Sequence, residues 1–418
     1  MPQLRANRET MIVLSSLIIQ IPLAVFLGHY YDERVFMATG YLVSSGLNPY
    51  QQHDFVGVFS HPLLNGVIPS IGYPPLWPLL LGAIFRLSYS IIPSLLLYNF
   101  AIKTPVILGN ICLAYAVRHI LLKTQSSQKI AKASWLFILF NPFILLTSSA
   151  WGNFDTVVAF LCVVSLYFLS TGKTKESAIT MAIGVAIKPI AIPLVGIPLL
   201  FSAPDQRRRA IQYLLMFSIV LLFSSLVPFF LFGWNIPFDP NEWNLPQFRM
   251  AGGMSPFNVI ELFQLTPMLP PELEFLGYLW VPALVAGYYI VFRNPPKTMN
   301  GLAQKAIGLT LVFFLTRSWL SEPNINLIFP FILLAVGPHK KSFLNFHFTW
   351  IIPLLFMFLN FSFQQLFFLP FPSVLSSLVT FDLQFGTLRL IARFLFAIVW
   401  QLLSWNVAAR MLINNEDK

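Results

Sequence analysis

Long apolar runs, interrupted by short polar segments, recur along almost the whole chain. A run of about 20 apolar residues can cross the hydrocarbon core of a bilayer as one helix. On this basis the pattern predicts an all-α, polytopic membrane protein with about twelve transmembrane helices, some of them shortened by prolines. The predicted spans are about 10 to 30, 93 to 117, 133 to 150, 156 to 172, 177 to 187, 190 to 202, 210 to 233, 274 to 292, 306 to 320, 324 to 337, 347 to 369 and 386 to 409.

The first loop, between the first and second predicted spans, is long and has a different pattern. Its apolar positions come in short pieces separated by prolines, as in "GYPPLWPLLLGAIFRLSYS". Pieces of this length are too short to cross and are typical of amphipathic helices that lie at the membrane interface. If residues 75–91 crossed instead, the basic segment 118–132 would lie outside, against the positive-inside rule. We therefore predict interfacial helices that roof a cavity.

Charge supports one orientation of these spans. Hydrophobic residues are 56% of the 418 and charged ones 10%, and the net charge is +10. The predicted spans put 18 of the 26 Lys and Arg on one side, namely Arg5, Arg8, Arg118, Lys123, Lys129, Lys132, Lys173, Lys175, Arg207, Arg208, Arg209, Arg293, Lys297, Lys305, Lys340, Lys341, Arg410 and Lys418. This is the positive-inside pattern, so both termini are predicted to be cytoplasmic and nucleic acid is not a predicted partner.

Most acidic residues fall on the opposite, outer side. The stretch "WGNFDTVVAF" places Asp155 at the beginning of an apolar run. Hydrocarbon tolerates an ionised carboxylate poorly, so such residues usually face a polar cavity or a partner. Two compatible roles remain for Asp155 and Asn153: they cap the following helix, or they bind substrate. In either case the chemistry faces outward.

Two lysines lie in apolar surroundings. Lys103 is about ten residues into the second predicted span, and Lys188 stands before Pro189 in "AIGVAIKPIAIPLVGIPLL". The latter stretch has basic residues at both ends, so it has to turn back near its middle, which brings Lys188 to the outer half of the membrane. Lys188 is then either a snorkelling lysine beside a kink or an ammonium held for an anion.

Several segments, in their order along the chain, resemble a known family. They are "YDERVF", "NPY", "YPPLWPLL", "FNPFILLTSSAWGNFDTVVAFL" and "AIGVAIKPIAIP", with looser likeness in "MSPF" and "RSWLSEPN". Together these segments resemble the integral-membrane GT-C glycosyltransferases, in particular mannosyltransferases of the glycosylphosphatidylinositol pathway and their prokaryotic relatives. The resemblance implies one GT-C-like domain over 1–418, with the motif-bearing module in 10–202 and more variable helices in 203–418. It also implies a polyprenyl phosphate sugar as donor.

One position departs from the family's pattern. Family members often carry two Asp residues, separated by one residue, before a Val-Phe pair. Here Asp32 stands where the second would, Tyr30 occupies the first position, and Glu33 is adjacent. This departure is evidence against metal binding by positions 30 and 32 together. It bears less on the role of Asp32 as a single catalytic base.

Sugar transfer from a lipid phosphate defines the groups that are needed. One carboxylate takes the proton from the acceptor hydroxyl, and the phosphate leaves already ionised, so cations rather than a second acid should hold it. We predict Asp32, with Glu33 beside it, as catalytic residues. Donor phosphate contacts are predicted for Lys188, Arg317 and Arg249, and substrate binding for Asp155, Asn153, Glu322 and Asp54. The alternatives are that Asp32 is a solvated loop acid and that Arg317 and Glu322 form a structural ion pair.

Neither a metal nor another cofactor is indicated. His53, Asp54 and His61 are spaced too widely for a convincing metal site, and a solvated loop explains them better. No glycine-rich phosphate loop is present in the sequence, which disfavours a nucleotide sugar donor. The predicted partners are a polyprenyl phosphate sugar, a lipid or glycan acceptor and membrane lipids.

The predicted function is therefore a hexosyltransferase, with mannose favoured by the resemblance, that acts on the outer or lumenal face. A lipid-linked sugar transporter or flippase is a competing class, as is a lipid-linked oligosaccharide ligase. A transporter predicts polar residues near the midplane and two halves of similar hydropathy, which the chain does not clearly have. Short termini without retrieval signals favour a prokaryotic plasma membrane over the endoplasmic reticulum.

Overall fold

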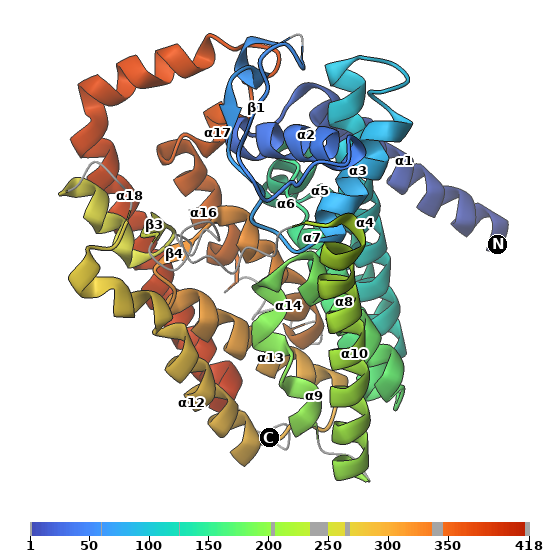
Figure 1. Cartoon of the computed structure of the whole chain (residues 1–418). Helices are drawn as coiled ribbons and strands as arrows, with labels where there is room; N and C mark the ends of the chain where they lie inside the picture. The colour runs from blue at the N-terminus through green and yellow to red at the C-terminus, as the bar shows by residue number, and fades with distance from the viewer. Residues whose placement is uncertain are drawn as a thin grey trace.

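The computed structural model describes residues 2–59, 61–124, 126–201, 205–234, 250–263, 268–336 and 346–413, without the side chains of residues 2–7 and 63. In these ranges the chain is mostly helical, and each of the four strands has two residues. Figure 1 shows long helices running roughly alongside one another, with shorter elements gathered at one end. The prediction of a helical membrane protein is thus confirmed.

Helices of very different length follow one another along the chain. In the first half the elements are α1 (Pro2–Phe26), α2 (Tyr30–Ser44), β1 (His53–Asp54), η1 (Pro62–Leu64), β2 (Val67–Ile68), α3 (Leu76–Leu87), α4 (Leu95–Lys123), α5 (Gln128–Phe140), α6 (Pro142–Leu145), the π-helical turn η2 (Leu146–Ala150), α7 (Asp155–Ser170), α8 (Thr174–Ile187), η3 (Pro189–Leu194), α9 (Ile197–Leu200) and α10 (Gln206–Phe232). In the second half they are β3 (Gly252–Gly253), η4 (Pro256–Leu262), η5 (Pro271–Tyr278), α12 (Trp280–Arg293), α13 (Met299–Leu315), β4 (Trp319–Leu320), η6 (Glu322–Leu327), α14 (Phe329–Val336), α16 (Phe348–Leu359), α17 (Ser362–Gln365) and α18 (Val374–Ile413).

Six helical segments of the described chain are long and apolar enough to cross a membrane. They are Arg8–Phe26, Leu95–Lys123, Gln128–Ala150, Gln206–Phe232, Pro271–Arg293 and Val374–Ile413. Further apolar helices have only 10–17 residues, α3, α7 and α13 among them. The chain is therefore multi-spanning, while the number of twelve crossings stays a prediction.

Two helices, α2 and α3, form in the loop for which interfacial helices were predicted. Figure 1 shows α2 lying across the directions of α4, α8 and α10. The ring of Trp77 in α3 stacks on Phe154 at 3.9 Å between centroids, and Phe36 and Tyr73 contact the same ring at 6.0 and 4.9 Å. Such pairs contribute about 0.5–1.5 kcal/mol each beyond their buried area. The α2–α3 layer is thereby anchored on the "WGNFD" segment.

The chain turns back at Lys188, as the sequence predicts. Lys188 has an extended backbone (φ −153°, ψ 122°) between α8 and η3, because the following Pro189 disfavours a helical conformation for the residue before it. The Lys188 ammonium binds Asp155 at the beginning of α7. At the other end of α7, the Cβ position of Gly172 lies 3.9 Å from Arg209 in the first turn of α10. The segment between α7 and α10 therefore runs from the Gly172 end of α7 to the Asp155 end and then back to the Gly172 end.

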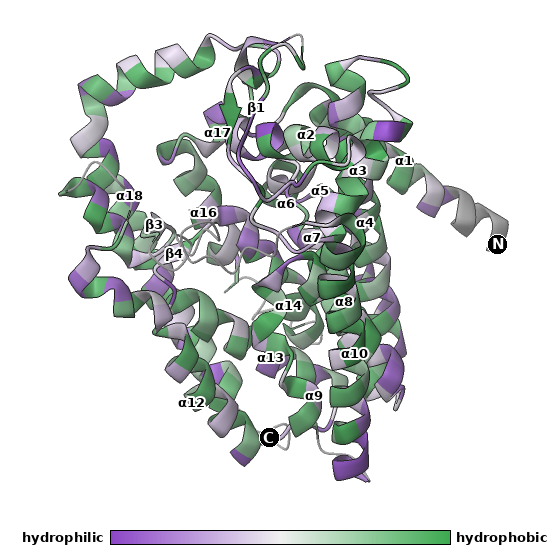
Figure 2. Cartoon of the chain, viewed as in Figure 1, coloured by the Kyte–Doolittle hydropathy of each residue, from purple (hydrophilic) through white to green (hydrophobic). Residues whose placement is uncertain are grey.

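The end of α18 lies at the end of the bundle opposite to Asp155 (Figure 1), and α1 contacts the last part of α4. Glu9 of α1 pairs with Arg118 near the end of α4 at 2.5 Å. Lys305, near the beginning of α13, donates hydrogen bonds to the carbonyl oxygens of Met411 and Leu412 at the end of α18. Figure 2 shows hydrophilic residues at the tip of α10 at this same end, where the helix begins with QRRR. Which side of the membrane this end faces stays a prediction.

The orientation leads to a labelling prediction. Ser90, between α3 and α4, and Lys175, in the first turn of α8, are both exposed, and they lie near opposite ends of the bundle. With the native cysteines replaced (Cys112→Ala, Cys162→Ala), an impermeant maleimide should label Ser90→Cys in intact cells. It should label Lys175→Cys only after the membrane is permeabilised. Labelling of position 175 in intact cells would show the orientation to be inverted.

Candidate functional site

Asp32 lies in the first turn of α2, next to the end of α1. Its carboxylate accepts a hydrogen bond from the indole Nε1 of Trp151 at 2.5 Å, and its side chain is 20% exposed. A carboxylate near a helix N-terminus is also favoured by the helix dipole. Asp32 is therefore held by one donor while part of it stays open to an incoming group.

His29 completes the contact between these two segments. Its ring stacks on Trp151 at 3.9 Å between centroids with an interplanar angle of 6°, and its Nδ1 lies 3.9 Å from the carboxylate of Asp32. Burial lowers the pKa of His29 to about 4, although the charge of Asp32 acts in the opposite direction. The imidazole is thus neutral at pH 7, and the negative charge of Asp32 is not cancelled by its neighbour.

The "WGNFD" segment gets its shape from the turn before it. The π-helical turn η2 ends at Ala150, and Gly152 follows with φ +91°, a conformation that favours glycine. The side chain of Asn153 accepts a hydrogen bond from the backbone N–H of Asp155 at 3.2 Å. The capping side chain is therefore Asn153, which leaves the carboxylate of Asp155 for another partner.

That partner is Lys188. Its ammonium lies 2.8 and 2.9 Å from the two carboxylate oxygens of Asp155 and 3.2 Å from the side-chain oxygen of Asn153. The rings of Phe154 and Tyr73 lie 5.3 and 5.5 Å from the same ammonium, within the range of cation–π attraction. Asp155 and Lys188 thus form a buried ion pair with a net charge near zero.

Arg317 brings a second cation to the same place. It follows α13, with its guanidinium 5.1 Å from the ring of Phe313, and its charge interacts with that of Asp155. Burial lowers the pKa of Arg317 to about 10, and Asp155 counteracts this, so the group stays positive at neutral pH. Among the described residues, no carboxylate pairs with Arg317 within 4 Å, and no acceptor takes a hydrogen bond from its guanidinium.

Glu33, predicted as catalytic beside Asp32, lies in different surroundings. Its side chain is fully buried, with Oε2 3.5 Å from the ammonium of Lys103 in α4. Burial raises the pKa of Glu33 to about 7, although the charge of Lys103 opposes this. Glu33 therefore faces a buried lysine, whereas Asp32 is partly open.

Three other predicted residues lie apart from this group. Glu322 is buried and accepts hydrogen bonds from Asn360 and Ser362. In the described structure, Arg317 and Glu322 therefore do not form the ion pair that was the alternative prediction. Asp54 is exposed in the β1–β2 hairpin, where it accepts a hydrogen bond from the backbone of Val56. Arg249 lies outside the described residues.

The second half of the chain reaches the site through a short pairing of strands. Gly252 and Gly253 of β3 pair in parallel with Trp319 and Leu320 of β4. Next to this pairing, the hydroxyl of Ser255 donates a hydrogen bond to the carbonyl oxygen of Arg317 at 3.0 Å. The "MSPF" and "RSWLSEPN" segments are thus neighbours, and their contact fixes the backbone that carries Arg317.

Residues 20–203 match the family described as alpha-(1→6)-mannopyranosyltransferase, N-terminal domain. The fold matches the crystal structure of ArnT from Cupriavidus metallidurans in the apo state with a TM-score of 0.53 and 14% identity, over 98% of this chain and 78% of that one. It also matches ArnT bound to undecaprenyl phosphate, with a TM-score of 0.52 and 14% identity, over 97% and 78%. No curated protein matches the chain in sequence.

The chain has the fold of these ArnT structures. The resemblance to GT-C glycosyltransferases drawn from the sequence is therefore confirmed, and the chain is a multi-pass membrane protein. On this fold the described site gathers residues of α2, α7 and the turn at Lys188, together with Arg317 after α13.

Sequence reasoning did not assign roles to three side chains of this region: His29, Trp151 and Tyr73. Trp151 is the first residue of the stretch "WGNFDTVVAF", which contains Asp155. A tryptophan indole N–H can only donate, so its presence in a predicted site indicates a hydrogen bond to an acid, here Asp32. His29 and Tyr73 carry no pattern of their own. Their contacts arise only when α2 and α3 pack on residues 151–155.

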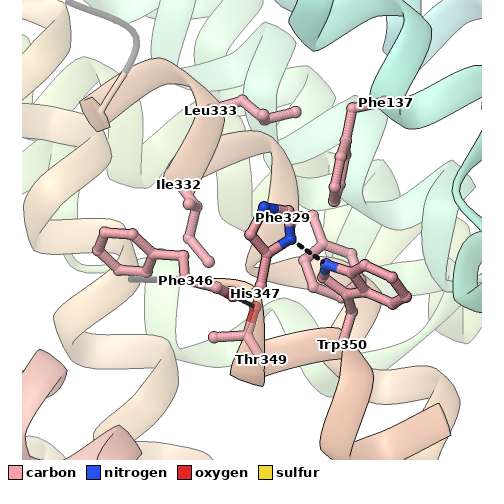
Figure 3. Close-up of a pocket in the computed structure, with 8 residues that line it drawn as sticks. All are labelled: Phe137, Phe329, Ile332, Leu333, Phe346, His347, Thr349 and Trp350. Atoms are coloured by element: carbon pink, nitrogen blue, oxygen red, sulfur yellow. Dashed lines mark hydrogen bonds between the residues drawn. The ribbon is translucent and has the colours of Figure 1, made fainter. Parts of the chain in front are cut away.

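No metal centre forms from the described residues, where no three His, Cys, Asp or Glu side chains gather closely enough to hold an ion. A small pocket lies elsewhere in the fold, between α5, α14 and α16 (Figure 3). It is lined by Phe137, Phe329, Ile332, Leu333, Phe346, His347, Thr349 and Trp350. None of the predicted site residues lines it, and His347 accepts a hydrogen bond from Trp350 there.

Gly152 gives a test of this geometry. A Cβ at Gly152 would lie 2.9 Å from Oε2 of Glu33 and 2.9 Å from Cε of Lys103, whereas a Cβ at Gly172 would meet only Arg209 at 3.9 Å. Both glycines have positive φ, so both alanine variants bear a similar backbone strain of about 1 kcal/mol.

Gly152→Ala should therefore be less stable than Gly172→Ala by roughly 1–3 kcal/mol, the usual range for overpacking. Thermal unfolding in detergent measures the difference. Equal melting temperatures of the two variants would mean that the Glu33–Lys103 pair is not packed against Gly152.

Proposed function

We propose that this protein is a glycosyltransferase that moves a sugar, with mannose favoured, from a polyprenyl phosphate to an acceptor hydroxyl. The observation that carries the proposal is that a partly open carboxylate, Asp32, and a cation without a described counter-ion, Arg317, both act on the charge of Asp155. The mannose preference rests on the match of residues 20–203 to a mannopyranosyltransferase family. A polyprenyl phosphate as partner is supported by the likeness to ArnT, which has been solved bound to undecaprenyl phosphate.

The proposed chemistry is a direct displacement at the anomeric carbon. Asp32 takes the proton of the acceptor hydroxyl, whose oxygen forms the new bond to the sugar. The bond between the anomeric carbon and the phosphate oxygen breaks, and the electron pair leaves with the phosphate. The phosphate departs already ionised, so it needs cations instead of a proton donor.

The two cations have different parts in this proposal. Arg317 is the principal phosphate ligand, because its planar guanidinium can donate to two phosphate oxygens at once. Lys188 is bound by Asp155 and Asn153, so it contributes a weaker attraction and holds the segment beside the phosphate. Arg249 remains proposed as a contact for an anionic lipid, and Glu322 and Asp54 as contacts for more distant parts of a substrate.

We place this reaction on the outer or lumenal face, with both termini cytoplasmic, in a prokaryotic plasma membrane. The basic residues at the end opposite to Asp32 support this orientation. The whole chain acts as one domain, and residues 10–202 carry most of the proposed site. A flippase would move the lipid without forming a product, and a ligase would transfer a whole oligosaccharide, so the mass of the product distinguishes the three.

The role of Asp32 is tested by Asp32→Asn. The amide keeps the shape of the side chain but cannot accept a proton, so single-turnover transfer should fall by about 10² to 10⁴ fold. Donor affinity should change much less. The exposed acid Glu272 of η5 offers a matched control, because Glu272→Gln removes an outer charge without touching the site.

Transfer from a labelled polyprenyl phosphate sugar, followed by mass analysis of the product, provides the measurement. Folding is checked by thermal melting in detergent. A well-folded Asp32→Asn protein with normal transfer would remove Asp32 from the role of base. It would also leave the proposed mechanism without its proton acceptor.

The difference between Arg317 and Lys188 gives a second prediction. Arg317→Ala should weaken donor binding by about 2–4 kcal/mol, the size of a desolvated charge-assisted contact, with little loss of stability. Lys188→Met should destabilise the protein by roughly 3–5 kcal/mol, because it leaves Asp155 buried and unpaired. Adding Asp155→Asn to Lys188→Met should restore most of that stability.

Donor affinity and unfolding are measured on the same detergent-solubilised preparations. Arg86→Ala is the control for Arg317→Ala, since Arg86 is an exposed arginine of α3 that contacts the carbonyl oxygen of Ser44. Unchanged donor affinity in Arg317→Ala would contradict the assignment of the phosphate site.

A further inference from the structure

Lys103 is a charge inside the second membrane helix that the proposed chemistry does not use. Its side chain has no exposed surface, and it is the ninth of the 29 residues of α4. A charge at such a position is expensive and is usually kept because it does something specific. The question is therefore what the ammonium of Lys103 holds.

Its partners come from three separate elements. The ammonium donates hydrogen bonds to the carbonyl oxygen of Leu27, just after α1, and to that of Ala150, at the end of η2, the latter at 2.9 Å. It also pairs with the buried carboxylate of Glu33 in α2 at 3.5 Å. The side chain of Lys103 thus joins the turn after α1, the end of η2 and the helix α2.

Other polar residues of α4 hold the same two segments. Asn99, one turn before Lys103, donates hydrogen bonds to the carbonyl oxygens of Val25 and Leu27 at 3.1 and 2.9 Å. Asn110, about two turns after Lys103, donates to Gln20 of α1 and Ser148 of η2, both at 2.8 Å. This spacing places the three on one face of the helix. The polar face of α4 therefore connects the end of α1 with η2 at two levels.

Each of these segments ends in a residue of the site. Leu27 is followed by His29 and then by Asp32, and Ala150 is followed directly by Trp151. The backbone N–H of His29 also donates to the carbonyl oxygen of Trp151 at 3.4 Å. The carboxylate of Asp32 and the indole N–H of Trp151 meet across this gap at 2.5 Å.

We propose that Lys103 is a positioning residue: by binding the carbonyl oxygens of Leu27 and Ala150 it fixes the distance between the two turns and so holds the Asp32 carboxylate against the Trp151 indole. This inference rests on the proposed function insofar as it concerns the rate of sugar transfer. The effect on the rate is expected to be large, because a misplacement of a catalytic group by about 1 Å costs about 10²-fold.

The main variant is Lys103→Met combined with Glu33→Gln. Methionine keeps much of the length of the lysine stem but donates no hydrogen bond, and the glutamine avoids leaving an unpaired buried carboxylate. It is compared with Glu33→Gln alone, which keeps the ammonium and its two carbonyl contacts. Relative to that single variant, the double variant should lose about 10- to 100-fold in kcat, with a donor KM changed by less than about threefold.

Lys305→Met is the matched control. Lys305 is also a buried lysine of a membrane helix, and it also donates to carbonyl oxygens, those of Met411 and Leu412 at the other end of the molecule. If loss of a buried lysine acts only through stability, both variants melt earlier and both keep their kcat when folded. We expect Lys305→Met to keep kcat within about threefold of wild type.

A second measurement does not depend on catalysis. Hydrogen exchange, followed by mass spectrometry, should show faster exchange in residues 27–33 and 146–155 of the double variant than of Glu33→Gln, while α10 is unchanged. Failure of the wild-type protein to transfer any sugar would refute the proposed function but not this effect. Unchanged exchange in both segments, or an unchanged kcat in the folded double variant, would overturn the positioning role of Lys103.

Discussion

A charge buried in a membrane protein has to find its counter-charge inside the protein, and the ion pair of Asp155 with Lys188 is the one on which this site depends. Asp155 is the first residue of α7, and Lys188 directly follows α8. Their ion pair therefore joins the end of α8 to the beginning of α7. The rings of Phe154 and Tyr73 flank the ammonium, and these rings also carry the α2–α3 layer. Removing one partner of such a pair typically costs about 3–5 kcal/mol. The covering layer, the turn and the site are therefore stabilised together.

The pair also simplifies the electrostatics of the site. Several ionisable side chains meet there, but Asp155 and Lys188 neutralise each other and His29 is uncharged. Among the described residues near the site, the carboxylate of Asp32 and the guanidinium of Arg317 keep their charges, as does Arg34, which donates to the hydroxyl of Tyr30. Opposite charges that are kept apart in this way can act on different parts of one substrate, with the base near the acceptor and the cation near the leaving group.

Much of this arrangement was predictable because it follows from patterns along the chain. The return of the chain at Lys188 follows from Pro189 and from basic residues on both sides of an apolar stretch. The formation of the short helices α2 and α3 follows from short apolar pieces between prolines, while their position at the membrane interface stays a prediction. These inferences succeed because each depends on a local property: length, a missing N–H, or the cost of moving lysine and arginine across a membrane.

The remaining features depend on which surfaces meet, and the sequence carries no local signal for that. The sequence offers both Asn153 and Asp155 as capping residues, but Asp155 is the first residue of α7, its N–H donates to the side chain of Asn153, and its carboxylate binds Lys188. The carbonyl partners of Lys103 follow from how α1 and η2 pack on α4. In the same way α18 begins at Val374, well before the predicted span, because its first part is a helical extension that Figure 1 shows bending into the long helix.

The ion pairs at the site also bear on how the protein is made. Glu33 and Lys103 both belong to the part of the chain that is synthesised first, and Asp155 and Lys188 are separated by only 33 residues. Lys103 and Lys188 are each synthesised after the carboxylate that they bind, so these two ion pairs can form before the second half of the chain emerges. Arg317 arrives much later, when its surroundings are already assembled. In the proposed function, Arg317 then adds the cation for the donor phosphate to a site whose two buried ion pairs are already formed.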